Sequence, residues 1–120
     1  MSVILSNNAR SLLAASITAS DTLVRVSAGH GDRFPNPTIV GDWFPLTLED
    51  ANGAIEIMKA TSRSGDTITV QRGAENTQAR AFNMGDAVEH RLTAAALNDI
   101  KNGGLTPSLL TVSIGDGSLG

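Results

Sequence analysis

Two histidines and no cysteines leave this sequence of 120 residues with few side chains for metal or nucleophile chemistry. His30 and His90 lie sixty positions apart. Zinc sites and metalloprotease motifs need histidines or thiolates paired at short spacing, so the sequence contains neither motif. The lack of cysteine also excludes disulfide bonds and thiol nucleophiles. We expect no metal and no cofactor, with His30 in an exposed loop and His90 half-exposed near a strand end.

The carboxylates do not form a pair suited to acid–base catalysis. Glu49 and Asp50 are adjacent, so in a strand they point to opposite faces, whereas the two acids of a glycosidase converge across a cleft. They are predicted to form a solvated hairpin tip. Five aspartates fall beside glycines or turns without the spacing of a calcium-binding EF-hand, and turn chemistry accounts for each of them: Asp32, Asp42, Asp50, Asp66 and Asp86. No catalytic residue is predicted.

Composition and charge limit the possible partners. Apolar residues make up 41% and charged residues 18% of the chain, which is typical of one folded domain. The net charge of −3 argues against a basic face for nucleic acid. The only cation in the first twenty residues, Arg10, follows the apolar residues 3–5, unlike the order in a signal peptide. The apolar runs are too short to cross a membrane. Neither nucleic acid nor a membrane is expected as a partner.

The apolar pattern predicts strands first and one helix late. Strands are expected at residues 22–27, 43–48, 54–61, 67–71 and 87–91. Asn52-Gly53 is a strong hairpin signal because both residues tolerate a positive φ. Residues 28–37 and 72–77 are predicted to be loops. The expected fold is therefore mainly β: a small antiparallel β-sandwich or barrel-like domain with a short C-terminal α-helix and an extended tail.

Alternation within the strands predicts which side chains face the core. Val24 and Val26 share one face of their strand, and Ile68 and Val70 point inward from theirs. In residues 54–61, Ile55 and Ile57 alternate with Glu56 and Met58, which predicts that the two isoleucines face the core.

The C-terminal part of the chain divides into a helix and a tail. Thr93 can cap a helix at residues 93–101, in which three consecutive alanines favour the helical state and Leu97 and Ile100 share one face. Residues 1–101 are expected to form a compact β-rich domain. Residues 102–120 are expected to be a flexible Gly-rich tail that is ordered only by a partner chain. Its apolar residues are candidates for contact with that partner, as are Leu97 and Ile100 of the helix: Leu109, Leu110, Val112 and Ile114.

The loop after residue 71 carries the most specific polar side chains. Arg72, Glu75 and Thr77 alternate with small or polar residues. An arginine and a glutamate three apart can pair and bind backbone groups, which would order a long connection. The same three side chains could instead contact a partner chain, and the sequence leaves both interpretations open.

At this loop the sequence resembles a known domain. The string RG-x-E-x-T begins at Arg72 and is followed by AF, GD-x-VE-x-R and LN. With residues 41–44 and 56–61, this string is similar to the N-terminal, virion-proximal domain of tail-fibre and tail-associated structural proteins of tailed bacteriophages. The resemblance covers about residues 5–100.

The resemblance implies a non-enzymatic structural module of the virion. In such proteins this region joins a fibre or spike to the tail or baseplate, and the distal part recognises the host. It implies contacts with other tail or baseplate proteins, a homotrimer, and a place in the virion tail after synthesis in the host cytoplasm. A fibre would continue well past Gly120, so the chain is either a small structural protein or the front end of a longer one, and no receptor binding is carried over.

Two alternatives stay open. Within the structural class, the chain could be a capsid decoration or head–tail joining protein. In a different class, it could be a small carbohydrate-binding or wall-degrading module, which would need an exposed aromatic platform around Phe34, Trp43 and Phe44. Trp43 or Phe44 is expected to anchor the core instead. The burial of Trp43 discriminates between these interpretations.

Overall fold

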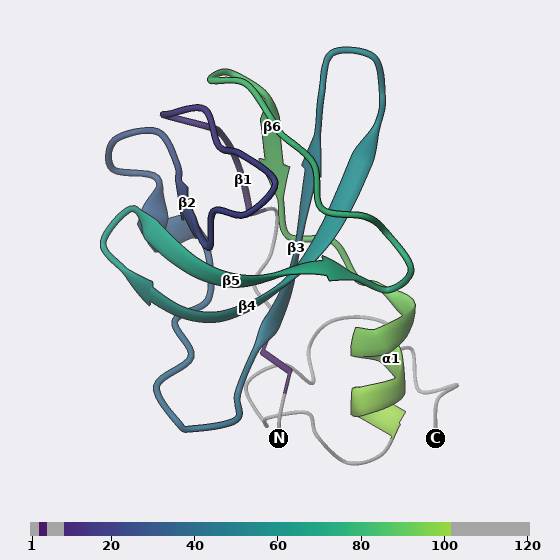
Figure 1. The fold of residues 1–120 in the computed structure, drawn as a ribbon. Helices are drawn as coiled ribbons and strands as arrows, with labels where there is room; N and C mark the ends of the chain where they lie inside the picture. The colour runs from purple at the N-terminus through teal and green to yellow at the C-terminus, as the bar shows by residue number, and fades with distance from the viewer. Residues whose placement is uncertain (1–2, 5–8, 102–120) are drawn as a thin grey trace.

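Six strands form one antiparallel sheet in the computed structural model, which describes residues 3–4 and 9–101 (Figure 1). In chain order the elements are β1 (Arg10–Leu12), β2 (Leu23–Arg25), the 3-10 turn η1 (Gly31–Arg33), β3 (Phe44–Glu49), β4 (Ile55–Ser64), β5 (Thr67–Ala74), β6 (Ala87–Glu89) and α1 (Ala94–Lys101). The predicted tail, including Leu109, Leu110, Val112 and Ile114, lies outside the described residues.

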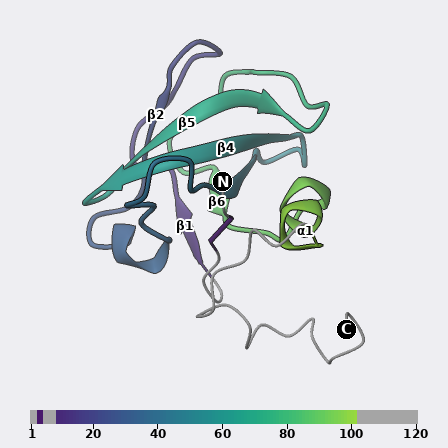
Figure 2. The ribbon, with the colours of Figure 1, turned by 90° about the horizontal axis from the view of Figure 1, so that it is seen from below.

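The sheet curls until its two outer strands meet. The strand order is β1-β6-β3-β4-β5-β2. Leu13 and Val26, the residues directly after β1 and β2, form an antiparallel bridge. On either side of it, Ala14 N–H donates to Arg25 O at 2.8 Å and Ser27 N–H donates to Leu12 O at 3.1 Å. The result is a curled half-barrel with one short helix at its side (Figures 1 and 2), which confirms the predicted fold class.

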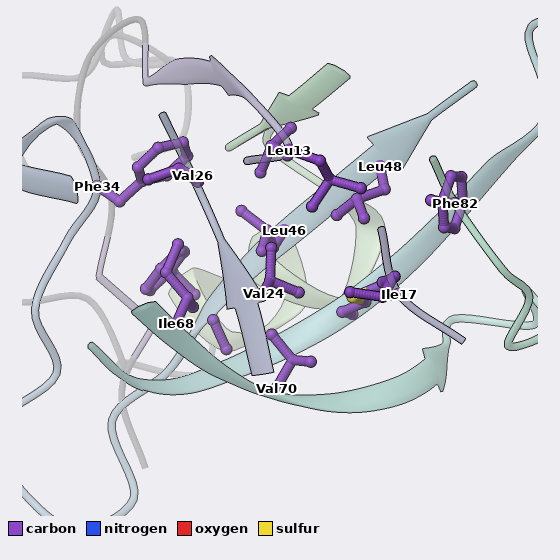
Figure 3. Packing of buried hydrophobic residues seen from close by; sticks show 14 of the residues in the cluster. Leu13, Ile17, Val24, Val26, Phe34, Leu46, Leu48, Ile68, Val70 and Phe82 are labelled. Atoms are coloured by element: carbon purple, nitrogen blue, oxygen red, sulfur yellow. The ribbon is translucent and has the colours of Figure 1, made fainter. Parts of the chain in front are cut away.

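The hydrophobic core fills the inside of the curl. Figure 3 shows side chains from β2, β3 and β5 converging there, among them Val24, Leu46 and Ile68. Phe34, which follows η1, stacks on Phe44 with ring centroids 6.4 Å apart. The predicted inward positions of Ile68 and Val70 are confirmed, and Val24 and Val26 are buried on the shared face predicted for them. Each such side chain contributes roughly 1.5–3 kcal/mol when fully buried, so the core supplies most of the drive to fold.

The predicted faces of β4 are wrong. Glu56, Met58 and Ala60 are buried, whereas Ile55 is 41% exposed. The register with β3 gives the reason, because Met58 lies opposite Leu46 and cross-strand partners share a face. Period-two alternation gives two faces but does not say which is inside, and the isoleucines favoured the wrong one.

β5 is longer than predicted, since it continues through Arg72 and Gly73 to Ala74. Ile57 pairs with Ala74 and Lys59 with Gln71, so two residues of β5 stand opposite Met58 alone. This is a β-bulge, and Gly73 supplies the positive φ of 63° that it requires. A bulge breaks the apolar alternation, which is why the sequence suggested a loop here.

Helix α1 is fixed at both ends. Thr93 Oγ1 accepts a hydrogen bond from Ala96 N–H at 3.2 Å, which confirms the predicted cap. At the other end, Trp43 Nε1 donates to Asp99 Oδ2 at 2.7 Å. Val3, Trp43 and Ala96 form a second small apolar cluster between the helix and the sheet. No helix among the described residues is long and apolar enough to cross a membrane.

Candidate functional site

A buried ion pair stands where sequence analysis placed a candidate contact surface. Arg72 Nε and Nη2 donate to Glu56 Oε2 and Oε1, each at 2.8 Å. The side chain of Arg72 is 8% exposed and that of Glu56 is fully buried. Two parallel N–H···O bonds of this kind fix both side chains in orientation as well as in distance.

Both side chains form their other hydrogen bonds with backbone groups. Arg72 Nη1 donates to the carbonyls of Thr18 and Asp21, and Nη2 donates to that of Arg80, all at 2.7 Å. Glu56 accepts from the N–H groups of Gly73 at 2.9 Å and Arg80 at 3.0 Å. The pair therefore ties β4 and β5 to two loops that have no ladder of their own.

The pKa of Glu56 lies below its usual value. Burial alone would raise this pKa, but the hydrogen bonds from Arg72 and from the N–H groups of Gly73 and Arg80 outweigh that effect. The carboxylate is therefore held in its charged form inside the domain. Sequence reasoning missed Glu56, and its only signal was a charge alternating with Met58 and Ala60 along β4.

Glu75 and Thr77 also bind within the chain. Glu75 does not pair with Arg72; its Oε1 accepts from Ala95 N–H at 3.0 Å, at the start of α1. Thr77 Oγ1 accepts from Ile57 N–H at 3.0 Å and donates to Ala74 O at 2.6 Å. Of the two interpretations, structural ordering accounts for the positions of these side chains, while contact with a partner stays a prediction.

The two predicted contact residues of α1 differ in their surroundings. Ile100 packs against the cluster of Val3, Trp43 and Ala96. Leu97 is half-buried, and the preceding Leu92 is exposed. Leu97 and Leu92 therefore offer apolar surface beside the helix.

One serine–histidine contact superficially resembles a catalytic arrangement. Ser11 Oγ lies 2.8 Å from His30 Nδ1. The nearby carboxylate of Asp66, however, accepts from Gly29 N–H at 3.0 Å and Gly31 N–H at 2.7 Å. Ser11 is itself buried and its hydroxyl accepts from Ser27 N–H. A nucleophile must reach a substrate carbonyl, and the buried hydroxyl of Ser11 is not accessible to one.

The two adjacent carboxylates at the β3–β4 hairpin, Glu49 and Asp50, each form a hydrogen bond with an arginine. Glu49 accepts from Arg91 and Asp50 from Arg80, each at 2.7 Å. Asp50 Oδ1 also accepts from two N–H groups of the turn. The Arg80 bond, and then the turn N–H groups, hold the pKa of Asp50 below its usual value. Within the described residues no cluster of three or more ligand side chains could hold a metal ion.

The aromatic rings are enclosed. Phe34, Trp43 and Phe44 are all buried, and Lys59 Nζ lies 5.2 Å from the centroid of Trp43. Phe44 lies in the main core, as expected for one of these two rings, and Trp43 anchors the contact between sheet and helix. None of the three rings offers a free face for stacking a sugar or a base.

Comparison with known proteins shows no family for this chain. No protein-family model matches the sequence, and no curated protein matches it.

Exposed apolar side chains are the other notable surface feature. Ile39 is 68% exposed and Val40 is fully exposed, in the loop before Trp43. Met84, at 67%, is exposed in the turn before β6. Ile39 and Val40 also line a groove, and exposed apolar residues that form a patch at a groove are typical of contact surfaces.

His90 makes the stability of the domain depend on pH near neutrality. Burial lowers the pKa of His90, and the bond from its Nδ1 to Pro45 O at 2.9 Å offsets this only in part. The folded chain therefore prefers neutral His90, whereas the unfolded chain protonates it near pH 6.5. We expect the free energy of unfolding to fall as the pH drops through about 6.5 towards the lower pKa that His90 has in the folded chain. Urea unfolding at several pH values measures this, and His90→Gln should flatten the dependence in that window. An unchanged slope would contradict it.

Proposed function

We propose that the chain is a structural protein of a tailed-bacteriophage virion, an attachment module of the tail fibre or baseplate that acts through protein–protein interfaces and without catalysis. The observation that carries this proposal is how the polar side chains are used. Arg72, Glu75 and Thr77 are bound within the chain, while apolar side chains such as Ile39 and Val40 face solvent. Such a chain is suited to contact other proteins.

The resemblance, which covers about residues 5–100, is the basis of the proposed location. It supports a place in the virion tail, after synthesis in the host cytoplasm, with other tail or baseplate proteins as partners. We propose a homotrimer, with Leu97 of α1 at the contact between copies. The burial of Trp43 favours this function over a carbohydrate-binding module, which needs an exposed ring.

Purified virions test the location. Tailed-phage particles from a culture that produces the chain are banded on a density gradient and analysed by mass spectrometry. They are then labelled with gold-conjugated antibody against the full chain. We expect the chain in the particles and gold at the tail, with antibody pre-adsorbed on the pure chain as the control. Absence of the chain from the particles would overturn the virion proposal, and gold on the head would favour the capsid alternative.

Light scattering tests the assembly. The full chain should give the mass of three chains of 12.4 kDa each. Leu97→Ser should shift it towards the monomer, because a serine removes the apolar contact. Asn98→Ser, at the exposed neighbouring position, is the matched control and should leave the mass unchanged. A monomeric wild-type chain would contradict the trimer without affecting the virion location.

A further inference from the structure

A groove of about 490 Å³ runs beside the loop that precedes Trp43. One wall is the loop, with Pro37, Ile39 and Val40, and the other is the outward face of β4 and β5, with Lys59 and Gln71. Two consecutive β-branched side chains, Ile39 and Val40, face solvent on this loop, and an apolar patch at the edge of a groove marks a contact site.

The groove lies close to the end of helix α1. Gly41 and Asp42 line it, and the next residue, Trp43, donates to Asp99 in the last turn of the helix. Lys59, which also lines the groove, lies over the ring of Trp43. The chain therefore continues beyond Lys101 from the helix turn to which Trp43, the neighbour of the lining residue Asp42, is bonded.

The chain outside the described residues contains a matching apolar segment. Residues 109–114 carry four apolar side chains and no charge. Seven residues, 102–108, separate the segment from Lys101, and they span at most roughly 25 Å when extended. Gly103 and Gly104 allow the chain to turn at the helix end. A tether this short raises the effective concentration of the segment at the groove to roughly the millimolar range.

We propose that residues 109–114 dock into the groove of their own chain, against Ile39 and Val40. The segment then covers the apolar loop, and no partner chain is needed to order it. This proposal replaces the expectation, drawn from composition, that only a partner chain orders residues 102–120. The inference rests on the groove and on the reach of the linker, and it is independent of the proposed place in the virion.

Amide hydrogen exchange on the full-length chain, followed by NMR, tests the docking. We expect the amides of residues 109–114 to exchange at least about tenfold more slowly than in a free peptide of the same sequence, equivalent to roughly 1.4 kcal/mol. The double variant Ile39→Ser/Val40→Ser should abolish this protection. Met84→Ser removes an equally exposed apolar side chain elsewhere and should preserve it. Val112→Asp places a charge in the docked segment and should also abolish the protection.

Three results would overturn the proposal. The first is exchange at the free-peptide rate in the wild-type chain. The second is protection that survives both the double variant and Val112→Asp. The third result uses a sample in which half of the chains carry ¹³C and ¹⁵N. In this sample the proposal requires nuclear Overhauser contacts between the Val40 and Val112 methyl groups of the same chain. Contacts only between labelled and unlabelled chains would place the segment on a neighbouring copy.

Discussion

Arg72→Ala is expected to lower the free energy of unfolding by about 3–5 kcal/mol, because it leaves the buried Glu56 carboxylate without its counterion. The carbonyls of Thr18, Asp21 and Arg80 lose their donor at the same time. A small domain has about 5–15 kcal/mol of stability in total, so the change is large. Urea unfolding followed by the fluorescence of Trp43 measures it.

The matched control is an arginine of an exposed pair. Arg91 lies 2.7 Å from Glu49 and 3.0 Å from Glu89, but the side chains of Arg91 and Glu49 are 38% and 37% exposed. Arg91→Ala should therefore cost less than about 1 kcal/mol. Similar effects for Arg72→Ala and Arg91→Ala would contradict the central role of the buried pair.

An apolar replacement of both partners should not restore the stability. Buried ion pairs can often be exchanged for apolar residues of similar volume at little cost. Here the pair also satisfies five backbone groups: the carbonyls of Thr18, Asp21 and Arg80 and the N–H groups of Gly73 and Arg80. Glu56→Leu/Arg72→Met would leave all five without their partners, at about 1–3 kcal/mol for each group that stays buried. A double variant as stable as the wild type would show that the backbone bonds contribute little.

Acid should weaken the same pair. The pKa of Glu56 is lower in the folded chain than in the unfolded chain, so its contribution is fully present above the unfolded-state pKa, near 4.3. It is lost as the pH falls below that value and through the folded pKa. The loss begins below about pH 4.3, whereas the loss from His90 begins near pH 6.5.

The sequence predicted the strands where alternation is regular and the turn is distinctive. The β3–β4 hairpin is such a case, because Asn52-Gly53 marks the turn and Gly53 has a φ of 85°. Helix α1 was also predicted, because Thr93 and the alanines act locally. Local signals of this kind are independent of the rest of the fold.

The ion pair could not be predicted in the same way. Glu56 and Arg72 are 16 positions apart on adjacent strands, and the bulge at Gly73 shifts the register that would align them. Alternation in β4 assigned the charge outward, since an unpaired carboxylate is costly inside. Only the pairing of strands reveals the partner. The exposed Val40 was missed for the opposite reason, because an apolar residue in a loop carries no periodic signal.

Gly31→Ala is expected to destabilise the domain by about 2–3 kcal/mol, through a steric clash rather than through backbone strain. A Cβ at this position would lie 1.9 Å from Gly65 O and 2.6 Å from Gly65 C. Both are backbone atoms of the β4–β5 turn, so no side-chain rotation relieves the overlap. The loop and the turn must separate, which breaks the bonds from Gly29 and Gly31 to the carboxylate of Asp66.

Gly29→Ala is the control that separates the two causes. Gly29 has a positive φ of 81°, and a Cβ there would meet no other atom within 4 Å, so alanine costs only the left-handed backbone, about 1 kcal/mol. Gly31 lies outside the positive-φ region, so strain alone would rank the variants in the reverse order. NMR titration adds a second readout, because the N–H groups of Gly29 and Gly31 hold the pKa of Asp66 below its usual value. In Gly31→Ala that pKa should rise; an unchanged pKa, or a smaller loss of stability than in Gly29→Ala, would show that the turn accommodates the methyl group.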